Sequence, residues 1–288
     1  MAVVVNGREI ADHILATLKL RVETLKQKNR TPLLAVVVVG DDKSSHTYIR
    51  KKGEAAEALG IRFLKFEFPA GTSQQQLIGE LERIQSEQPV SGIILQLPVP
   101  EELWPHTREI VSHISLDVDV DCLSYAALGR VLMHESRFTP PTPGAILEVL
   151  NHHQVPLEGK EVCLVGRGDL IGKPLAGLLM HQPVTLTVCG HATGDLARYT
   201  RTADIVITGV GKKDLVRGDM LKPGAVVIDA GVSFFDGKMY GDIHYESVAA
   251  VASLVTPTPG GVGPITVAKL LQNTVQSAEY QAGVPATL

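Results

Sequence analysis

The chain has 288 residues, of which 44% are hydrophobic and 20% charged, and its formal net charge is −4. This composition is ordinary for a globular protein, and the length allows two domains that each have a core. The small negative charge excludes a general attraction to nucleic acids or anionic membranes. No apolar run is long enough to cross a bilayer, the N-terminus lacks a signal-peptide pattern, and the three cysteines are scattered. We expect a soluble cytoplasmic protein with neither nucleic acid nor membrane as a partner.

The first third of the chain alternates between two patterns. Segments with apolar residues at helical spacing are followed by short apolar runs that are typical of buried strands. Repeated alternation of this kind predicts an α/β fold with a parallel, doubly wound sheet. We expect helices at residues 10–25, 44–59 and 73–86, and strands at residues 33–39, 61–68 and 92–97.

Two polar side chains interrupt apolar patterns in this region. Tyr48, Lys52 and Leu59 fall on one face of the expected helix, so the lysine lies within an otherwise apolar stripe. Its ammonium either reaches solvent or lies in a cleft where burial lowers its pKa. Gln96 interrupts an apolar strand near its carboxyl end, where open α/β sheets bind ligands. It is either a satisfied core amide or a side chain that holds a ligand or positions Lys52.

Asp117, Asp119 and Asp121 alternate with valines, which superficially suggests a calcium loop. Counted from Asp117, the sixth position is Cys122 and not Gly, and the twelfth is Leu128 and not Glu, so the EF-hand pattern fails. We predict no metal site. Strict alternation would point the three carboxylates in one direction, with one of them binding a ligand and the others capping or solvated.

An apolar run at residues 162–165 stops at a glycine turn, and an amphipathic segment follows at residues 174–180. A strand, a glycine turn and a helix in this order let backbone N–H groups approach a pyrophosphate. The spacing of Gly166, Gly168 and Gly172 is one residue longer than the usual dinucleotide fingerprint. The segment is therefore either a dinucleotide-binding turn or an ordinary tight turn.

Three further strands are expected at residues 184–188, 205–208 and 226–228, and the last two end near glycines. After the first of them, the acidic residue that often reads the ribose is missing. His191 stands there and either faces the adenosine ribose or a 2′-phosphate, or is a solvated loop residue.

The tetrapeptide Pro-Thr-Pro-Gly occurs at residues 141–144 and again at residues 257–260. Because proline fixes φ and disfavours helix in the residue before it, we expect both copies to be stiff, extended connectors between two lobes with a cleft between them. The predicted domains are residues 1–141, completed by a C-terminal helix at residues 265–280, and residues 142–264 as a Rossmann-type NAD(P)-binding domain.

Several short motifs occur together and in a fixed order, and together they are highly specific. On them the chain resembles the bifunctional methylenetetrahydrofolate dehydrogenase / methenyltetrahydrofolate cyclohydrolase family over essentially its whole length. The motifs are Tyr48 with Lys52, Gln96-Leu97-Pro98, Asp119-Val120-Asp121, Gly166-Arg167 with Gly172-Lys173-Pro174, and Pro259-Gly260-Gly261-Val262-Gly263-Pro264.

The resemblance implies a cytoplasmic homodimer of one-carbon metabolism, serving purine, methionine and histidine biosynthesis. Such an enzyme oxidises 5,10-methylenetetrahydrofolate with NADP and hydrolyses the methenyl product to 10-formyltetrahydrofolate. By analogy Tyr48 stacks on the p-aminobenzoyl ring, Lys52 is the catalytic residue of the hydrolysis, Gln96 tunes and orients Lys52, and Asp121 binds the pterin. The implied folate-site residues also include Leu95, Leu97, Pro259, Gly260, Gly261, Val262 and Gly263, and the implied cofactor residues are Gly166, Arg167, Gly168, His191 and Val232.

Departures from the family pattern bear on both sites. On the substrate side, Val118 and Cys122 stand where the family has Lys and Gly, and Ala127 stands in an Asn position. On the cofactor side, Gly168 stands where the family has the serine of Gly-Arg-Ser. Gly190 and His191 stand where the family has the histidine and serine of Cys-His-Ser, so two serine hydroxyls are lost. Arg167 remains, and we expect NADP ahead of NAD because arginine is the stronger phosphate ligand.

Three alternatives are open at this stage. The first is a folate enzyme that retains only one of the two activities. The second is a non-catalytic regulator that binds a dinucleotide or folate. The third is a two-lobed dehydrogenase of the shikimate type, against which the doubled Pro-Thr-Pro-Gly segment and the spacing of Tyr48 and Lys52 both argue.

Overall fold

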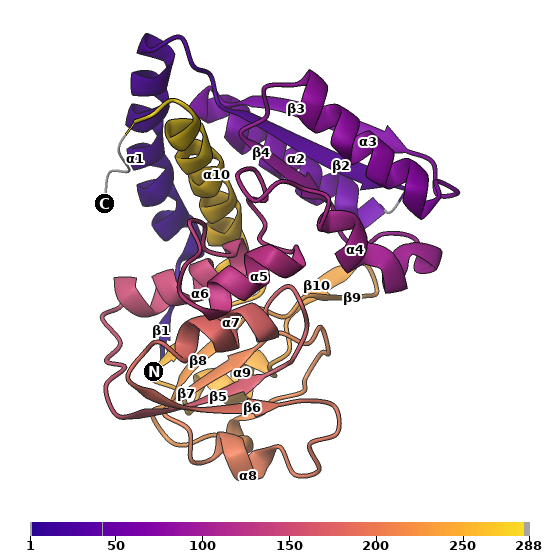
Figure 1. Cartoon of the computed structure of the whole chain (residues 1–288). Helices are drawn as coiled ribbons and strands as arrows, with labels where there is room; N and C mark the ends of the chain where they lie inside the picture. Colours follow the sequence, from indigo (N-terminus) through magenta and orange to yellow (C-terminus); the bar gives the residue numbers. More distant parts are fainter. Residues whose placement is uncertain (1, 42, 285–288) are drawn as a thin grey trace. The chain divides into compact units, whose positions relative to one another are not determined.

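The computed structural model describes residues 2–41 and 43–284 (Figure 1). The chain folds into two compact units. Unit 1 consists of residues 1–12 and 142–266, and unit 2 consists of residues 13–141 and 267–288. Each unit is therefore assembled from segments that are distant in the sequence.

Unit 2 contains a three-stranded parallel sheet with the strand order β3-β2-β4. The central strand β2 (Leu33–Val39) is buried at every position, and it pairs with β3 (Arg62–Phe68) and β4 (Gly92–Leu95). A parallel strand that is covered on both faces needs apolar side chains throughout, which explains its continuous apolar sequence. Buried leucine and isoleucine side chains of α3 (Gln74–Glu87) pack into the same core.

Helices make up most of the remainder of unit 2. The hydroxyl of Ser73 caps α3 by accepting a hydrogen bond from the backbone N–H of Gln76, 3.3 Å away. Arg21 donates two hydrogen bonds to Glu279, of 2.8 and 2.6 Å, and so joins the first helix to the last. The helices are α1 (Gly7–Gln27), α2 (Lys43–Leu59), η1 (Glu101–His106), α4 (Thr107–Val111), α5 (Tyr125–Leu132) and α10 (Val262–Gln281).

Unit 1 contains a six-stranded parallel sheet with the order β1-β11-β8-β7-β5-β6. The order reverses between β5 and β7, which is the switch point where doubly wound sheets bind ligands. The strands are β1 (Val3–Val4), β5 (Lys160–Val165), β6 (Val184–Cys189), β7 (Ile205–Thr208), β8 (Val226–Asp229) and β11 (Leu254–Val255).

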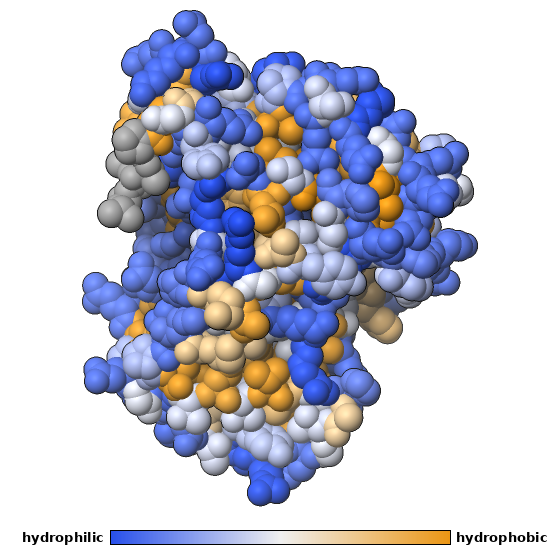
Figure 2. All heavy atoms as spheres, in the orientation of Figure 1, coloured by the Kyte–Doolittle hydropathy of each residue, from blue (hydrophilic) through white to orange (hydrophobic). Residues whose placement is uncertain are grey.

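Apart from α6, the other elements of unit 1 are short. Figure 2 shows apolar side chains at the surface of this part of the molecule. Leu170, Met180 and Val188, which lie in or next to α7 (Gly172–Leu179) and β6, are exposed. The elements are α6 (Pro141–His152), α7 (Gly172–Leu179), α8 (Ala197–Thr200), η2 (Gly218–Met220), α9 (Tyr245–Ala249) and the antiparallel hairpin of β9 (Ser233–Phe235) and β10 (Lys238–Tyr240).

The predicted fold class, α/β with parallel sheets in two parts, is confirmed. The long strands and helices lie close to their expected positions because continuous apolar runs and helical periodicity are strong signals. None of the helices in the described part of the chain is long and apolar enough to span a membrane.

The two copies of Pro-Thr-Pro-Gly were expected to be similar extended connectors, and this prediction is wrong. Residues 141–144 form the first turn of α6, whereas residues 258–260 form a turn ahead of α10. Proline is accommodated in the first turn of a helix because the backbone N–H that it lacks would have no helical partner there.

Residues 1–12 were expected to lie with the first domain but group with unit 1. Val3 and Val4 pair in parallel with Leu254 and Val255, and the backbone N–H of Gly7 donates to the carbonyl of Gly260, 3.0 Å away. Two residues carry too little pattern for this strand to be recognised from the sequence. Its hydrogen bonds to β11 decide its place.

Candidate active site

Lys52 lies on α2 and is held by a glutamine at the end of β4. Its Nζ donates a hydrogen bond of 2.9 Å to Oε1 of Gln96. Nε2 of Gln96 donates in turn to the carbonyl oxygen of Leu97, 2.7 Å away. Because the second bond uses the amide nitrogen, the amide oxygen is directed at the lysine. Gln96 is thus an oriented, uncharged acceptor for the amine.

Burial and charge act on the amine in opposite directions. Lys52 is closely surrounded by protein, and burial lowers its pKa, while the negative charge of Asp121 raises it. Burial raises the pKa of Asp121 to about 6, with Lys52 opposing and Asp119 reinforcing the shift. Each group is less easily ionised than in water, so a neutral amine is more accessible here than on an exposed lysine.

The two other aspartates of the alternating segment, Asp117 and Asp119, differ from Asp121 and from each other. Asp117 is exposed and accepts a hydrogen bond of 2.9 Å from Arg137. Asp119 is buried and accepts from the backbone N–H groups of Leu123 and Ser124. The expectation that all three carboxylates point one way is therefore wrong, because residues 116–121 form turns on either side of a single β-bridge between Asp119 and Ile93, and not an extended strand.

The other expected folate residues of unit 2 lie on α2 and at the end of β4. Tyr48 lies one helical turn before Lys52, and burial raises the pKa of its phenol. Leu95 is buried as the last residue of β4, and Leu97 is partly buried. The structure thus brings Lys52, Gln96 and Asp121 together at the carboxyl end of the sheet.

The glycine loop at residues 259–263 belongs to unit 1, and its closeness to Lys52 stays a prediction. Gly260 has φ +104°, and a Cβ on Gly261 would lie 2.6 Å from the carbonyl oxygen of Pro257. Both positions therefore require glycine. Val262 and Gly263 open α10.

The predicted glycine turn after β5 is tightly packed at two of its three glycines. Gly166 has φ +126°, and a Cβ there would lie 2.8 Å from the carbonyl oxygen of Gly209. A Cβ on Gly172, the first residue of α7, would lie 2.3 Å from the carbonyl oxygen of Gly166. Around Gly168 nothing lies within 4 Å of such an atom. Two glycines are needed for the close approach of strand, turn and helix, and the third has no such steric reason.

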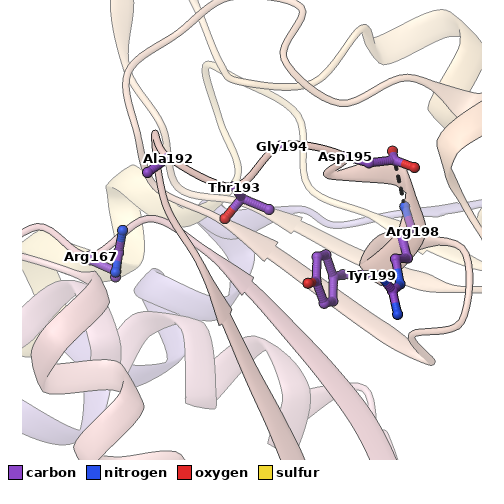
Figure 3. Close-up of a pocket in the computed structure, with 7 residues that line it drawn as sticks. All are labelled: Arg167, Ala192, Thr193, Gly194, Asp195, Arg198 and Tyr199. Atoms are coloured by element: carbon purple, nitrogen blue, oxygen red, sulfur yellow. Dashed lines mark hydrogen bonds between the residues drawn. The ribbon is translucent and has the colours of Figure 1, made fainter.

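A cavity of about 510 Å³ lies beyond the ends of β5 and β6 (Figure 3). Of the expected cofactor residues, Arg167 lines it. His191 is exposed in the same turn and is not part of the lining, and Val232 is exposed after Gly231. The lining residues are Arg167, Ala192, Thr193, Gly194, Asp195, Arg198 and Tyr199.

Two buried aspartates that the sequence analysis missed organise the glycine loops of unit 1. Asp242 accepts hydrogen bonds of 2.7, 2.8 and 2.7 Å from three successive backbone N–H groups, those of residues 210, 211 and 212. Asp229, at the end of β8, accepts from Thr208 and from the backbone N–H groups of residues 231, 242 and 243. Burial raises the pKa of Asp229 to about 6. An acidic residue that ends an apolar strand was the available signal.

One departure from the family pattern has a visible backbone consequence. Cys122, where the family has Gly, has φ +57° and is buried. Its thiol lies 3.8 Å from the carbonyl oxygen of Phe138. A left-handed conformation favours glycine, so this turn keeps its shape with a less suitable residue.

Comparisons with known proteins match both parts of the chain. Residues 5–121 match the catalytic-domain model of tetrahydrofolate dehydrogenase/cyclohydrolase, and residues 140–282 match the NAD(P)-binding-domain model of the same family. Bifunctional protein FolD 2 of Acinetobacter baylyi is 42% identical over 280 residues, which is 97% of this chain and 99% of that protein. The chain belongs to the tetrahydrofolate dehydrogenase/cyclohydrolase family.

Solved structures of this family have the same fold over nearly the whole length. The bifunctional FolD enzyme of Campylobacter jejuni superposes with a TM-score of 0.93 at 35% identity, covering 98% of this chain and 100% of that one. The FolD enzyme of Trypanosoma brucei, solved with NADP and an inhibitor, gives 0.92 at 36% identity, with 97% and 98% covered. The resemblance that the motifs indicated is confirmed.

Proposed function

We propose that this protein oxidises 5,10-methylenetetrahydrofolate to the methenyl derivative with NADP, and then hydrolyses that product to 10-formyltetrahydrofolate. Family membership and the bifunctional relatives support the pair of reactions. The observation that carries the proposal for this chain is the lysine whose amine is partly buried, hydrogen-bonded to Gln96 and electrostatically coupled to Asp121.

In this proposal unit 2 binds the folate and unit 1 binds the dinucleotide. Tyr48 stacks on the p-aminobenzoyl ring, Asp121 binds the pterin, and Leu95, Leu97 and residues 259–263 complete the folate site. Holding the methylene carbon against the nicotinamide is the main requirement of the oxidation.

The turn after β5 fits a dinucleotide. Gly166 and Gly172 leave no room for side chains, so backbone N–H groups at the start of α7 can approach a pyrophosphate. Asp242 fixes the backbone of residues 210–212 at the end of the neighbouring strand β7. NADP, when bound, supplies the hydride acceptor. Arg167, on the same turn, is the proposed ligand of its 2′-phosphate.

The hydrolysis follows from the chemistry of an iminium carbon. Water adds to the methenyl carbon and forms a C–O bond, and the water proton must be removed. Neutral Lys52 can accept that proton as a general base, or its ammonium can donate to the developing hemiaminal as the C–N bond breaks. Gln96 holds the amine without adding charge, whereas a carboxylate would raise the pKa of Lys52.

The test is to follow both half-reactions with purified protein. With methylenetetrahydrofolate and NADP, methenyl absorbance should rise and then decay. Lys52→Met should slow the decay at least about a hundredfold, since general acid–base groups contribute roughly 10²–10⁴. Lys51→Met, which changes the exposed neighbour, should behave as wild type. Absence of turnover with either nicotinamide cofactor would overturn the proposal.

Assaying the two steps separately also decides whether only one activity survives the changes at Val118, Cys122 and Ala127. The variants Cys122→Gly and Ala127→Asn restore family residues for this purpose.

We further propose a cytoplasmic homodimer that supplies purine, methionine and histidine biosynthesis. Sedimentation velocity of the purified chain tests the dimer, and supplementation of a deletion strain with these products tests the metabolic role.

A further inference from the structure

The cavity beyond β5 and β6 has two arginines in its lining, from different elements. Arg167 comes from the turn after β5, and Arg198 comes from α8. In Figure 3 the two lie toward opposite ends of the lining, with Thr193 between them and Tyr199 next to Arg198. In a doubly wound domain, the region after the second strand is where the adenosine ribose is read.

The position of Arg167 depends on Gly190. A Cβ on Gly190 would lie 2.3 Å from both Nε and one Nη of the guanidinium and 2.6 Å from its carbon. Hydrogen bonds fix this glycine, because its N–H donates to Oγ1 of Thr193 at 3.0 Å and its carbonyl accepts from the N–H of Thr193 at 2.9 Å. The loss of a side chain at residue 190 therefore lets Arg167 lie across the end of β6.

Arg198 is available to an anion. Its guanidinium carbon lies 5.9 Å from the ring centroid of Tyr199, which also lines the cavity. Within residues 2–41 and 43–284, no carboxylate forms a salt bridge with either Arg167 or Arg198. Arg201, one turn further along, differs because its Nε donates to the carbonyl oxygen of Asp219, 3.0 Å away.

The acidic residue of the lining, Asp195, is committed to the backbone. Its Oδ1 accepts a hydrogen bond of 3.3 Å from the backbone N–H of Arg198 and so supports the first turn of α8. Asp195 lies beyond the end of β6 (Val184–Cys189), and two arginines share its cavity. The positive side chains outnumber the carboxylate in this cavity by two to one.

We propose that Arg198 is a specificity-determining residue that binds the 2′-phosphate of NADP together with Arg167. This inference rests on the proposed function and deepens it. Arg167 is retained from the family pattern, and the guanidinium of Arg198 takes the place of the two hydroxyls that the family has and this chain lacks, at positions 168 and 191. NAD has no phosphate at this place and gains nothing from Arg198.

The test compares two fragments of the cofactors by isothermal titration calorimetry. Adenosine 2′,5′-bisphosphate carries the additional phosphate, and 5′-AMP does not. Arg198→Gln should weaken binding of the bisphosphate about tenfold or more, which is the usual effect of losing a charge-assisted hydrogen bond, and should leave 5′-AMP binding unchanged. Arg201→Gln is the matched control, and it should change neither affinity.

Kinetics give a second readout. Arg198→Gln should raise KM for NADP with little change in kcat, and it should narrow the preference for NADP over NAD by the same factor. Arg198→Lys should recover part of the loss, because it keeps the charge without the planar fork. Thermal melting of each variant shows that it is folded.

The outcomes separate this inference from the proposed function. Bisphosphate affinity within twofold of wild type in Arg198→Gln overturns the role of Arg198, even if the enzyme is active. A selective loss of bisphosphate binding in a protein that turns over no folate supports the role of Arg198 and overturns the dehydrogenase proposal.

Discussion

Carboxylates with a raised pKa occur in both units, and their binding partners differ between the units. In unit 2, Asp121 shares a partly buried site with an amine, and each group shifts the pKa of the other. In unit 1, Asp229 and Asp242 direct their oxygens at backbone N–H groups. Burial raises the pKa in all three cases. Asp121 faces an amine of opposite charge, whereas Asp229 faces a second carboxylate, Asp242, which raises its pKa further. The difference teaches that a raised pKa points to reactive chemistry where an oppositely charged titratable side chain shares the site, and to structural support where backbone N–H groups bind the oxygens.

The largest effect is expected from the steric demands of unit 1. Gly172→Ala would place a Cβ 2.3 Å from the carbonyl oxygen of Gly166 and 2.7 Å from the Cα of Arg167, and neither backbone atom can move aside cheaply. We expect the free energy of unfolding to fall by roughly 3 kcal/mol. We also expect NADP binding to be lost, because the turn can no longer keep its shape. Gly168→Ala, which meets no atom within 4 Å, should stay within about 0.5 kcal/mol of wild type. Urea unfolding and cofactor titration measure both, and equal effects of the two substitutions would contradict the packing argument.

Asp229→Asn tests whether the carboxylates of unit 1 are structural. The amide would present N–H groups to backbone donors that now find an acceptor, at a cost of about 2 kcal/mol near neutral pH. The folded pKa of about 6 lies above the ordinary 3.8, so the folded state holds this proton more tightly. The pH-dependent part of the stability that the aspartate contributes is therefore fully present below pH 3.8 and is lost as the pH rises to about 6. Denaturant curves between these limits should show the variant furthest below wild type at the acidic end.

Gln96→Glu tests whether the partly buried amine of unit 2 takes part in the reaction. A carboxylate beside the ammonium stabilises its charge and raises the pKa of Lys52, so less neutral amine is present at a given pH. A rise of one unit would slow hydrolysis at neutral pH about tenfold and move the ascending limb of its pH–rate profile to higher pH. Gln75→Glu, on the exposed side of α3, serves as the control. An ascending limb that stays in place would exclude Lys52 as the general base.

Asp121→Asn should move the ascending limb of the pH–rate profile of hydrolysis to lower pH. This shift should be smaller than the shift to higher pH in Gln96→Glu. The charge of Asp121 raises the pKa of Lys52, so its removal lowers that pKa further and the ascending limb shifts to lower pH by about one unit or less. The overall rate also falls if Asp121 binds the pterin, so the position of the limb is the informative quantity. Asp117→Asn, which removes an exposed partner of Arg137, should leave the limb where it is.

The sequence predicted those parts of the fold that are determined by the residues of a single segment. The strand at residues 33–39 is recognisable because a buried parallel strand is apolar at every position, and Gln96 stands out because it interrupts such a run. The glycine turn after β5 is recognisable for the same reason. In each case one segment carries its own signal.

The parts that were missed depend on partners far along the chain. Asp242 binds backbone groups about thirty residues earlier, and β1 pairs with a strand near the opposite end of the sequence. From the sequence, Pro141 is expected to interrupt a helix, but in the structure it is the first residue of α6. Arg198 and Tyr199 look like solvated helix residues until the cavity that they line is seen.

Strand β1 has a practical consequence for anyone who dissects this molecule. Because Val3 and Val4 form the outermost strand beside β11, an excised fragment that starts at residue 142 would leave that neighbour with an unpaired edge. Splicing residues 2–12 onto the far end of such a fragment through a flexible linker would restore the edge. Circular permutation is therefore the sensible route to an isolated nucleotide-binding module, and affinity tags fused just ahead of Val3 are best avoided.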